Sequence, residues 1–467
     1  MEVLALVIGI ALLIFLVVRT KIQAFPALIL SAITIGLLSG LNPITTISAV
    51  TSGFGNTLTS IGIVIGFGCI MGQLLERSGG AKRMALTILK WVGVQHADIV
   101  LGLSGFLVSI PVFCDSGFVI LSQLAKELAR ITRKSMVLMG GILGMGLYIT
   151  HFLVPPTPGP LAVAGFFNID LGLFIFWGLV LSIPLFAVAV LLFRYLGKKY
   201  PEFIPEQEID RSQYSDEQLQ VLDRITEKTK NEIALTSEDF EGLMSTEKLP
   251  SAFLSFATIL VPLGLIFFNT FVTNVLGITE GTLAQVSGLL GSPVVALFIS
   301  VLIAIYLLDS TMDRETALKE TEAALGSAGL IVFVTGAGGA LGGVISAAGT
   351  GVILAEAILG MNLPVIFVPL LVGTLLRIPQ GSGTAAMVTG GSILAPMLGT
   401  LGLNPVLAGL ALCLTTMCPS YMNDSYFWVV TRFSGFDVKT SLKTWSVATV
   451  VIPLVGSVLL ILASLFL

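Results

Sequence analysis

Long runs of apolar residues, separated by short polar segments, make up most of the chain. Helices of about 17 to 25 apolar residues are long enough to cross the hydrocarbon core of a bilayer. Four runs approach or reach that length, at residues 3–18, 22–40, 171–193 and 451–467. The pattern therefore predicts an all-α polytopic membrane protein. Because the first run has no basic segment before it and no small-residue cleavage site after it, we expect a retained helix.

The composition agrees with a bilayer environment and divides the chain into three parts. Apolar residues make up 55% and charged residues 11%, whereas a soluble domain carries roughly 25% charged residues. The stretch from Arg194 to Lys248 holds 8 basic and 13 acidic side chains, which leaves 16 basic and 15 acidic ones elsewhere. No basic face remains for nucleic acid. We predict a first membrane repeat at 1–195, a charged loop at 196–250 and a second membrane repeat at 251–467.

Basic residues in the short loops predict the orientation of the chain. Cytoplasmic loops carry an excess of Lys and Arg. The segments 41–52, 275–287 and 348–363 contain no basic residue. Basic residues gather instead at Arg19, Lys21, Arg77, Lys82, Arg83, Lys126, Arg130, Arg133, Lys134, Lys198 and Lys199. We therefore expect the central loop in the cytoplasm and both termini outside.

The two halves of the chain share a pattern of Gly and Pro residues. Gly66, Gly68, Gly72 and Gly79 recur 270 positions later, Gly105, Ile110 and Pro111 recur 268 later, and Pro155 recurs 264 later. The distribution of Lys and Arg predicts that residues 53–75 run toward the cytoplasm and that residues 326–346 run toward the outside. The pattern predicts two inverted-topology repeats, which are typical of secondary transporters.

One pair of polar interruptions falls between apolar arms too short to span a membrane. The first is at residues 111–117, between arms at 99–112 and 118–124, and its counterpart is at residues 377–384. We predict re-entrant hairpins that enter from opposite sides, the alternative being ordinary loops. A helix that begins at Thr384 or Ala385 would point the positive end of its dipole at an anion.

A second pair of interruptions breaks two spanning helices. Residues 155–160 contain four prolines, and residues 419–425 contain Asn423, Asp424 and Ser425. Non-helical backbone at membrane depth is tolerated where it lines a cavity or is buried in protein. We expect both breaks to face a substrate, although the first could instead be a packing kink.

Five ionisable residues are predicted to lie inside the membrane, where such residues are costly and usually functional. They are Asp115, His151, Glu356, Arg377 and Asp424. Glu356 ranks last because it lies toward the outer end of its segment. Arg377 could bind a substrate carboxylate through its planar fork, or be a counter-ion to Asp115 or Asp424. His151 could be structural, although an imidazole also suits proton coupling.

Other classes of function fit less well. The chain has two histidines and no cysteine pair at ligand spacing, so we expect neither a metal nor a cofactor. Asp115 and Asp424 could be proposed as an intramembrane aspartyl protease pair. The Gly-rich segment 338–343 lacks the Lys–Ser/Thr of a phosphate-binding loop. A transporter is preferred over an enzyme, and an uncoupled anion channel is the alternative from another class.

The same segments resemble the gluconate permease family of anion–proton symporters, within the ion transporter superfamily. The resemblance rests on Ile-Pro-Val-Phe-Cys-Asp-Ser-Gly-Phe-Val-Ile-Leu at 110–121, Thr-His-Phe-Leu-Val-Pro-Pro-Thr-Pro-Gly-Pro at 150–160, Gln-Gly-Ser-Gly-Thr at 380–384, Asn-Asp-Ser at 423–425 and Ser-Leu-Lys-Thr-Trp at 441–445. It implies a polytopic protein of the bacterial inner membrane, a homodimer with two hairpins and an elevator-like or rocking exchange of its site. Relatives take gluconate, other sugar acids, glycerate or D-serine. They often have Glu at Asp115 and His at Thr157 and Tyr421, so the exact acid stays open.

These observations give a set of expected site residues. The substrate carboxylate is placed near Ser116, Gly117 and the turn at residues 381–384, with hydroxyl partners at Thr157, Asn423 and Ser425. Asp115, Asp424 and His151 are the candidates for proton coupling, while Ser382 and Thr384 could instead bind sodium. The full set is Asp115, Ser116, Gly117, His151, Thr157, Arg377, Gln380, Gly381, Ser382, Gly383, Thr384, Asn423, Asp424 and Ser425. The partners expected are a small organic anion, protons and the lipid bilayer.

Overall fold

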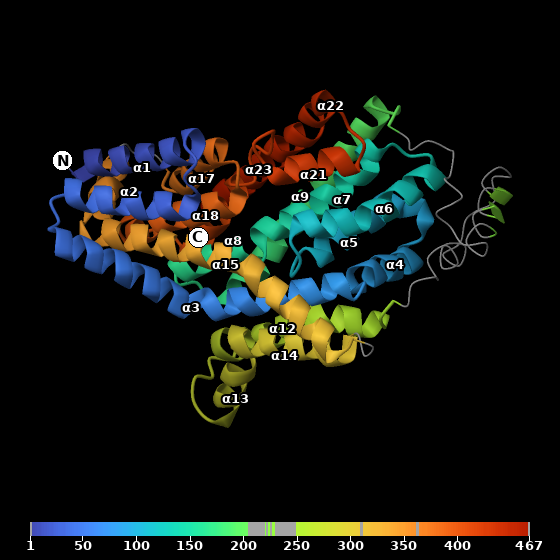
Figure 1. Cartoon of the computed structure of the whole chain (residues 1–467), viewed down its shortest axis with the longest axis horizontal. Coiled ribbons are helices and arrows are strands. Elements are labelled where there is room, and N and C mark those ends of the chain that lie inside the picture. The colour runs from blue at the N-terminus through green and yellow to red at the C-terminus, as the bar shows by residue number, and fades with distance from the viewer. Residues whose placement is uncertain are drawn as a thin grey trace.

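The structure is a computed structural model that describes residues 2–203, 220, 223–224, 227–228, 249–308, 312–360 and 364–465. Regular structure in these ranges is entirely helical (Figure 1). Seven helices of the described residues are long and apolar enough to cross a membrane, or up to nine if two bent pairs each count as one span. The all-α polytopic fold is therefore confirmed. Most of the charged loop predicted at 196–250 lies outside the described residues.

Residues 2–203 form nine α-helices, and local sequence signals mark several of their ends. Asn42 accepts a hydrogen bond from the Thr45 amide at 2.8 Å, and Pro43 occupies the first helical position after it. The helix break predicted at 155–160 lies between Leu153 and Pro158. The helices are α1 Glu2–Arg19, α2 Ala24–Leu38, α3 Pro43–Arg77, α4 Gly80–Val92, α5 Ala97–Val108, α6 Cys114–Thr132, α7 Met136–Leu153, α8 Pro158–Phe166 and α9 Leu171–Lys199.

The second half repeats the order of a long helix, a short helix, a pair joined by a turn, and a broken helix. The inverted relation between the halves stays a prediction. The helices that the structure describes after the central loop are α12 Ala252–Thr270, α13 Thr282–Leu290, α14 Pro293–Ile303, α15 Arg314–Ala347, α16 Thr350–Leu359, α17 Phe367–Gln380, α18 Gly383–Leu394, α19 Leu398–Leu401, α20 Pro405–Thr415, α21 Ser425–Phe433, α22 Val438–Lys443 and α23 Trp445–Ala463.

The two long helices α3 and α15 pack antiparallel along the body of the molecule (Figure 1). Gly53 of α3 lies against the carbonyl of Gly339, and Gly343 lies against the carbonyl of Ala49. A side chain at either glycine would meet backbone atoms, so glycine permits the close approach. In Figure 1, α5 and α6 lie toward one end of the molecule, and α17 and α18 toward the end that carries the N terminus.

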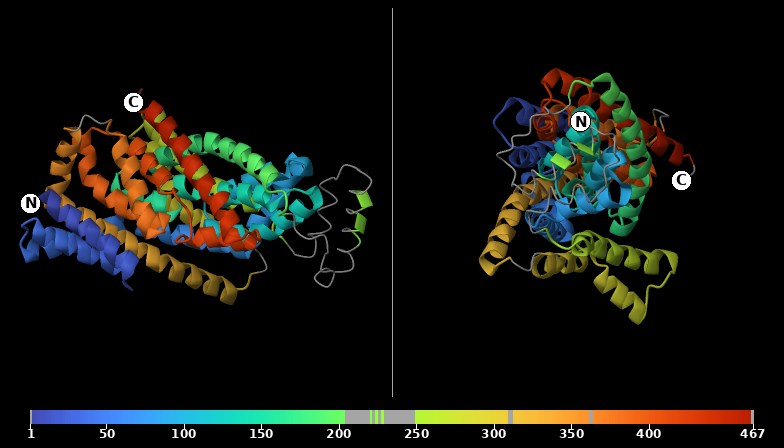
Figure 2. Two further views of the ribbon diagram at one scale, coloured as in Figure 1. Left: turned by 90° about the horizontal axis from the view of Figure 1, so that it is seen from above. Right: turned by 90° about the vertical axis from the view of Figure 1, so that its right-hand side faces the viewer.

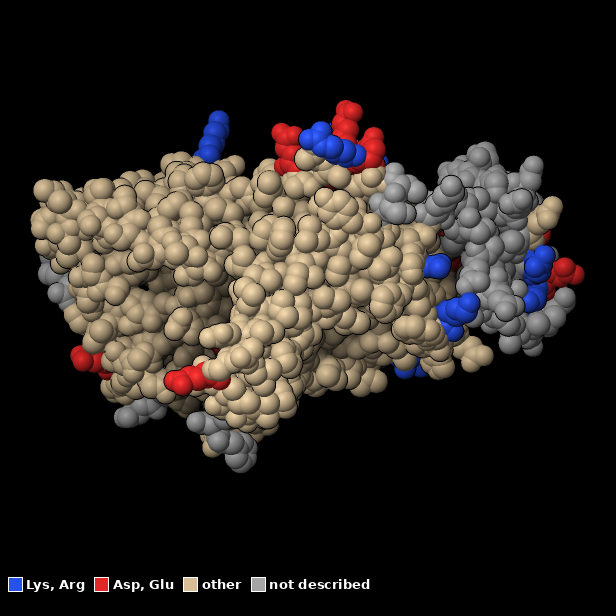
Figure 3. All heavy atoms as spheres, turned by 90° about the horizontal axis from the view of Figure 1, so that it is seen from below, with Lys and Arg blue, Asp and Glu red and all other residues tan. Residues whose placement is uncertain are grey.

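The surface is largely uncharged. Figure 3 shows one face on which Lys, Arg, Asp and Glu occupy only a few places. Large apolar side chains are exposed on outward faces, for example Ile183 at 65%, Phe253 at 78% and Leu454 at 59%. Figure 2 shows α12 to α14 as an outer layer beside the body. Such surfaces are stable against lipid tails, and the protein is a multi-pass membrane protein.

Candidate functional site

The turns and breaks singled out in the sequence bring four helix N-termini together. Gly381, in the turn before α18, lies against the backbone of Asn423, just before α21. Gly159, at the start of α8, lies beside Thr384. The start of α6 joins the group because α6 packs on α21, where the rings of Phe118 and Tyr426 have centroids 6.1 Å apart. Because each N-terminus carries the positive end of its helix dipole, their shared space favours an anion.

Arg377 is fully buried and paired with Asp424. Its Nη2 donates to Asp424 Oδ2 at 2.6 Å and to the Tyr148 hydroxyl at 3.2 Å, and its Nη1 donates to the carbonyl of Gly381. Arg377, which lies in α17, therefore connects three other segments: α7, the turn before α18, and the break before α21. The structure thus pairs Arg377 with Asp424, and the role of Arg377 toward a substrate carboxylate stays a prediction.

Further donors hold the Asp424 carboxylate in place. The Ser420 hydroxyl donates to Oδ2 at 2.5 Å, and Trp445 Nε1 donates to Ser420 Oγ at 2.9 Å. The amide of Tyr426 donates to Oδ1 at 3.2 Å, so Asp424 is also the N-cap of α21. Arg377, the other member of the ion pair, donates to the hydroxyl of Tyr148. The Tyr148 ring stacks on that of Tyr426 with centroids 5.4 Å apart. These contacts fix one geometry around Asp424.

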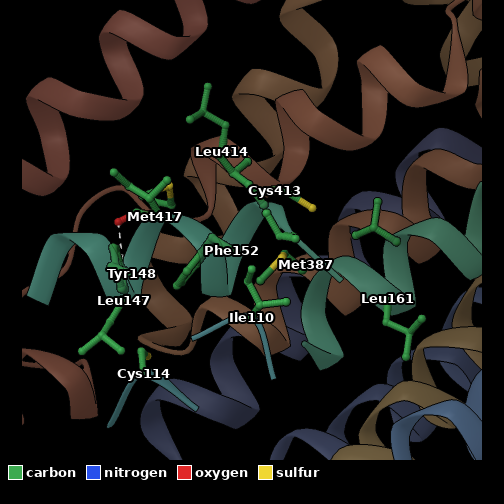
Figure 4. Close-up of a cluster of buried hydrophobic side chains, with 14 of the residues drawn as sticks. Ile110, Cys114, Leu147, Tyr148, Phe152, Leu161, Met387, Cys413, Leu414 and Met417 are labelled. Atoms are coloured by element: carbon green, nitrogen blue, oxygen red, sulfur yellow. Dashed lines mark hydrogen bonds between the residues drawn. The ribbon is translucent and has the colours of Figure 1, made fainter. Parts of the chain in front are cut away.

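A cluster of buried apolar side chains joins the two halves of the chain. Figure 4 draws this cluster, with Ile110 and Phe152 from the first half and Met387 and Leu414 from the second. The Tyr148 hydroxyl donates to the carbonyl of Met417 at 3.1 Å. Buried contacts therefore connect the two halves of the chain beside Tyr148.

Asp115 differs from Asp424 in its surroundings. It lies half-buried in the first turn of α6, where the Cys114 thiol donates to its Oδ2 at 3.6 Å. None of the ion pairs between described residues includes Asp115. With Arg377 already neutralised by Asp424, the carboxylate of Asp115 is the surplus negative charge of the site.

Polar side chains around these groups reach the surface. Ser382, Asn423 and Ser425 are exposed, whereas Ser116, Gln380 and Thr384 are half-buried. Asn423 Nδ2 and the Tyr421 hydroxyl both donate to the carbonyl of Ile378, at 2.9 and 2.7 Å. Ser382 accepts from the Ala385 amide at 3.3 Å and is the N-cap of α18, which begins at Gly383.

His151 and Thr157 are buried at the break between α7 and α8. The His151 ring lies 6.0 Å from the Phe113 ring, and its Nδ1 has no hydrogen-bond partner among the described residues. The Thr157 hydroxyl donates to the carbonyls of His151 and Val154, both at 2.8 Å. Its proton is therefore already used, and Thr157 can only accept from a substrate hydroxyl.

The remaining expected residues separate into two groups. Gly117 is buried in the first turn of α6, whereas Asp115 and Ser116 in the same turn are half-buried. Glu356, ranked last, is exposed on α16, a helix that packs on α1, α15 and α19. The sequence did not single out Tyr148, Ser420, Tyr426 and Trp445, because a buried aromatic or hydroxyl residue in a membrane helix resembles ordinary core.

The comparison with known protein families decides the family. The model for GntP family permeases matches residues 1–223 and 219–466. The chain belongs to the GntP permease family. Family membership and the spanning helices together place it among multi-pass inner-membrane transporters, and the predicted resemblance is confirmed.

Full-length relatives in the GntP family carry several names. The chain is 40% identical to an uncharacterized permease of Haemophilus influenzae, over 99% of this chain and 92% of that protein. It is 31% identical to a gluconate permease of Pseudomonas aeruginosa, over 97% and 96% of the two chains. It is also 31% identical to the D-serine transporter DsdX of Escherichia coli K12, over 97% of each. The identity to the gluconate permease and to the D-serine transporter is the same, so identity alone does not select a substrate.

The GntP chain also shares its fold with a distantly related solved transporter. Its structure matches that of the YdaH transporter of Alcanivorax borkumensis with a TM-score of 0.65 at 15% identity, over 93% of this chain and 96% of that one. At this identity the likeness shows the fold alone.

Proposed function

We propose that this GntP permease is a secondary active transporter that imports a small organic anion, gluconate or a related sugar acid, together with a proton. The observation that carries the proposal is the unequal pairing of the two carboxylates. Asp424 is neutralised by buried Arg377, while Asp115 stands at the same group of helix N-termini outside every ion pair of the described residues. The relatives named for gluconate support the same class of substrate.

Helix N-termini supply the donors for the substrate carboxylate. The structure shows no side-chain cap at the start of α6 or α8. Pro158 and Pro160 have no amide proton, so Gly159 provides the free donor in the first turn of α8. Uncapped amides at both helices, with the exposed hydroxyl of Ser425 beside Asp115, suit an acid that also carries hydroxyl groups.

The same arrangement couples substrate to a proton. An ionised Asp115 repels an anion bound at its side, and the repulsion is strong where little water screens it. Protonation of Asp115 removes that repulsion, so the acid binds preferentially to the protonated carrier. If the loaded and empty carriers cross while the half-loaded ones do not, uphill import of the anion follows the proton gradient.

Substitution of the two aspartates tests the proposal in proteoliposomes. Asp115→Asn mimics the protonated group, so it should keep exchange of labelled for unlabelled gluconate and lose accumulation driven by an acidic exterior. Asp424→Asn should instead lower thermal stability, because it leaves Arg377 uncompensated. If both variants still concentrate gluconate under a proton gradient, coupling through a site carboxylate is wrong, and His151 or sodium becomes the better candidate. Non-saturating flux with single-channel currents would favour an anion channel.

A second substrate fits the same observation. An ionised Asp115 could bind the ammonium group of D-serine while the helix N-termini bind its carboxylate, and a D-serine transporter is among the relatives. The two substrates make opposite demands on one side chain. Asp115→Asn should preserve gluconate binding and abolish D-serine binding, so thermal shifts of wild type and variant with each ligand distinguish them.

A further inference from the structure

His151 lies in the last turn of α7, in contact with the first residues of two helices that begin at the site. The centroid of its ring lies 6.0 Å from that of Phe113, which is the N-cap of α6. Its carbonyl accepts from the hydroxyl of Thr157, the N-cap of α8, at 2.8 Å. Its ring also lies 5.6 Å from that of Phe152, which packs against Gly383 at the start of α18. His151 is therefore placed among three of the four helix N-termini.

The side chain of His151 is buried, and its Nδ1 lacks a hydrogen bond. Only 6% of the residue is exposed, and Nδ1 has no partner among the described residues. Buried polar atoms are almost always hydrogen-bonded, because an unpaired one loses its interaction with water and gains nothing in return. The hydroxyl of Thr157 cannot supply the donor, since it already donates to the carbonyls of His151 and Val154. The site therefore contains a polar atom that a bound group can satisfy.

A hydroxyl group matches this atom better than an ammonium group does. Nδ1 donates in one tautomer of the imidazole and accepts in the other, and a hydroxyl both donates and accepts, whereas an ammonium only donates. The proposed function gives the substrate carboxylate to the uncapped amides of α6 and α8. His151 contacts the N-cap residues of these same two helices. The substrate group expected next to Nδ1 is therefore the one on the carbon that carries the carboxylate.

We propose that Nδ1 of His151 forms a hydrogen bond with the 2-hydroxyl group of the substrate, so that the site selects 2-hydroxy acids. The inference rests on the proposed import of a sugar acid and names the hydroxyl that the site recognises. A substrate that lacks this hydroxyl leaves Nδ1 unpaired, so it binds more weakly even though its carboxylate is unchanged. His151 is thus a specificity-determining residue, and carrying the proton is left to Asp115.

Removing each partner of this hydrogen bond, separately and together, tests the inference. The affinities of the purified full-length chain for gluconate and 2-deoxygluconate are measured by calorimetric titration. Wild type should bind 2-deoxygluconate roughly tenfold to a hundredfold more weakly than gluconate, as expected for an unpaired buried polar group. His151→Phe keeps a planar ring and removes the polar atoms. It should weaken gluconate binding by a similar factor and bind the two acids nearly equally, because the two losses are not additive.

Matched variants separate recognition from packing and from proton transfer. His151→Asn places an amide near the position of Nδ1, so it should recover part of the preference for gluconate. At saturating gluconate it should still accumulate the acid in proteoliposomes under a proton gradient. Ser31→Ala removes another buried polar group without a partner, on α2, which packs on α1, α3 and α15. This variant should leave both affinities at their wild-type values.

Two results would overturn the inference. One is equal weakening of both acids by His151→Phe with their ratio unchanged, which would show that the histidine only packs. The other is loss of driven accumulation in folded His151→Asn, which would show that the imidazole carries the proton. If His151→Phe does not fold, His151→Leu gives the same comparison. Failure of wild type to bind either acid would instead contradict the proposed substrate class itself.

Discussion

At the scale of single residues, the pair of Arg377 and Asp424 should dominate the stability of the site. Both side chains are almost completely buried, with 0% and 7% of their surface exposed. Removing one member of a buried pair typically costs about 3–5 kcal/mol because the other charge is left uncompensated. Arg377→Met should therefore lower the thermal unfolding temperature in detergent strongly, and adding Asp424→Asn should recover part of the loss.

The ion pair of Arg77 and Glu320 is the matched control. Its arginine is 60% exposed and its glutamate 16%. Surface pairs contribute about 0–1 kcal/mol, so Glu320→Gln should change the unfolding temperature little. Equal effects of Arg377→Met and Glu320→Gln would contradict the assignment of Arg377 as a buried counter-ion.

The sequence identified the charged residues of the site but left open which carboxylate pairs with Arg377. Asp115, Arg377 and Asp424 stand out because a charge in an apolar segment is costly. Which carboxylate meets Arg377 depends on packing, since Asp424 lies 47 positions away and Tyr148 lies 229 positions away.

At the scale of helices, Gly72 should be intolerant of any side chain. An alanine there would press against the backbone carbonyl of Pro111, which cannot move without shifting the hairpin turn. Gly72→Ala should lower the unfolding temperature and the transport rate together. Gly342 of α15, which lies against the carbonyl of Ser392 in α18, should behave alike.

Gly55→Ala is the control within the same helix. A side chain at Gly55 would meet open space. Alanine is favoured over glycine in a helix interior by about 0.5–1 kcal/mol, so this variant should be as stable as wild type or slightly more so. If Gly72→Ala and Gly55→Ala behave identically in unfolding and transport, the close packing of α3 on the hairpin turn is not required.

Helix ends were predicted well where Gly or Pro marks them. The end of α6 was missed, because only the change from apolar to charged residues was used to place it. The break before Pro158 and the start of α18 within a residue or two of Thr384 follow local signals. The second arm of the first hairpin was expected to end at residue 124, but α6 continues to Thr132. It continues because Leu124 and Leu128 stay buried on one face while Arg130 pairs with Glu127 at 3.0 Å.

At the scale of the whole molecule, the order of elements agrees with duplication, and the orientation remains to be measured. The inverted repeats, the homodimer and the elevator-like exchange implied by the family resemblance stay predictions. Their common premise is that opposite ends of the helices face opposite sides of the membrane. The premise can be tested at exposed positions, where labelling does not depend on the state of the transport cycle.

Thr279 and Lys198 are suitable positions for that test. Both are exposed, Thr279 in the connection before α13 and Lys198 in the last turn of α9. Short loops rich in Lys and Arg stay in the cytoplasm, which places Lys198 inside and the base-free segment 275–287 outside. In a cysteine-free background, an impermeant maleimide should label Thr279→Cys in intact cells and label Lys198→Cys only after permeabilisation. Labelling of both in intact cells, or the reverse pattern, would contradict the orientation.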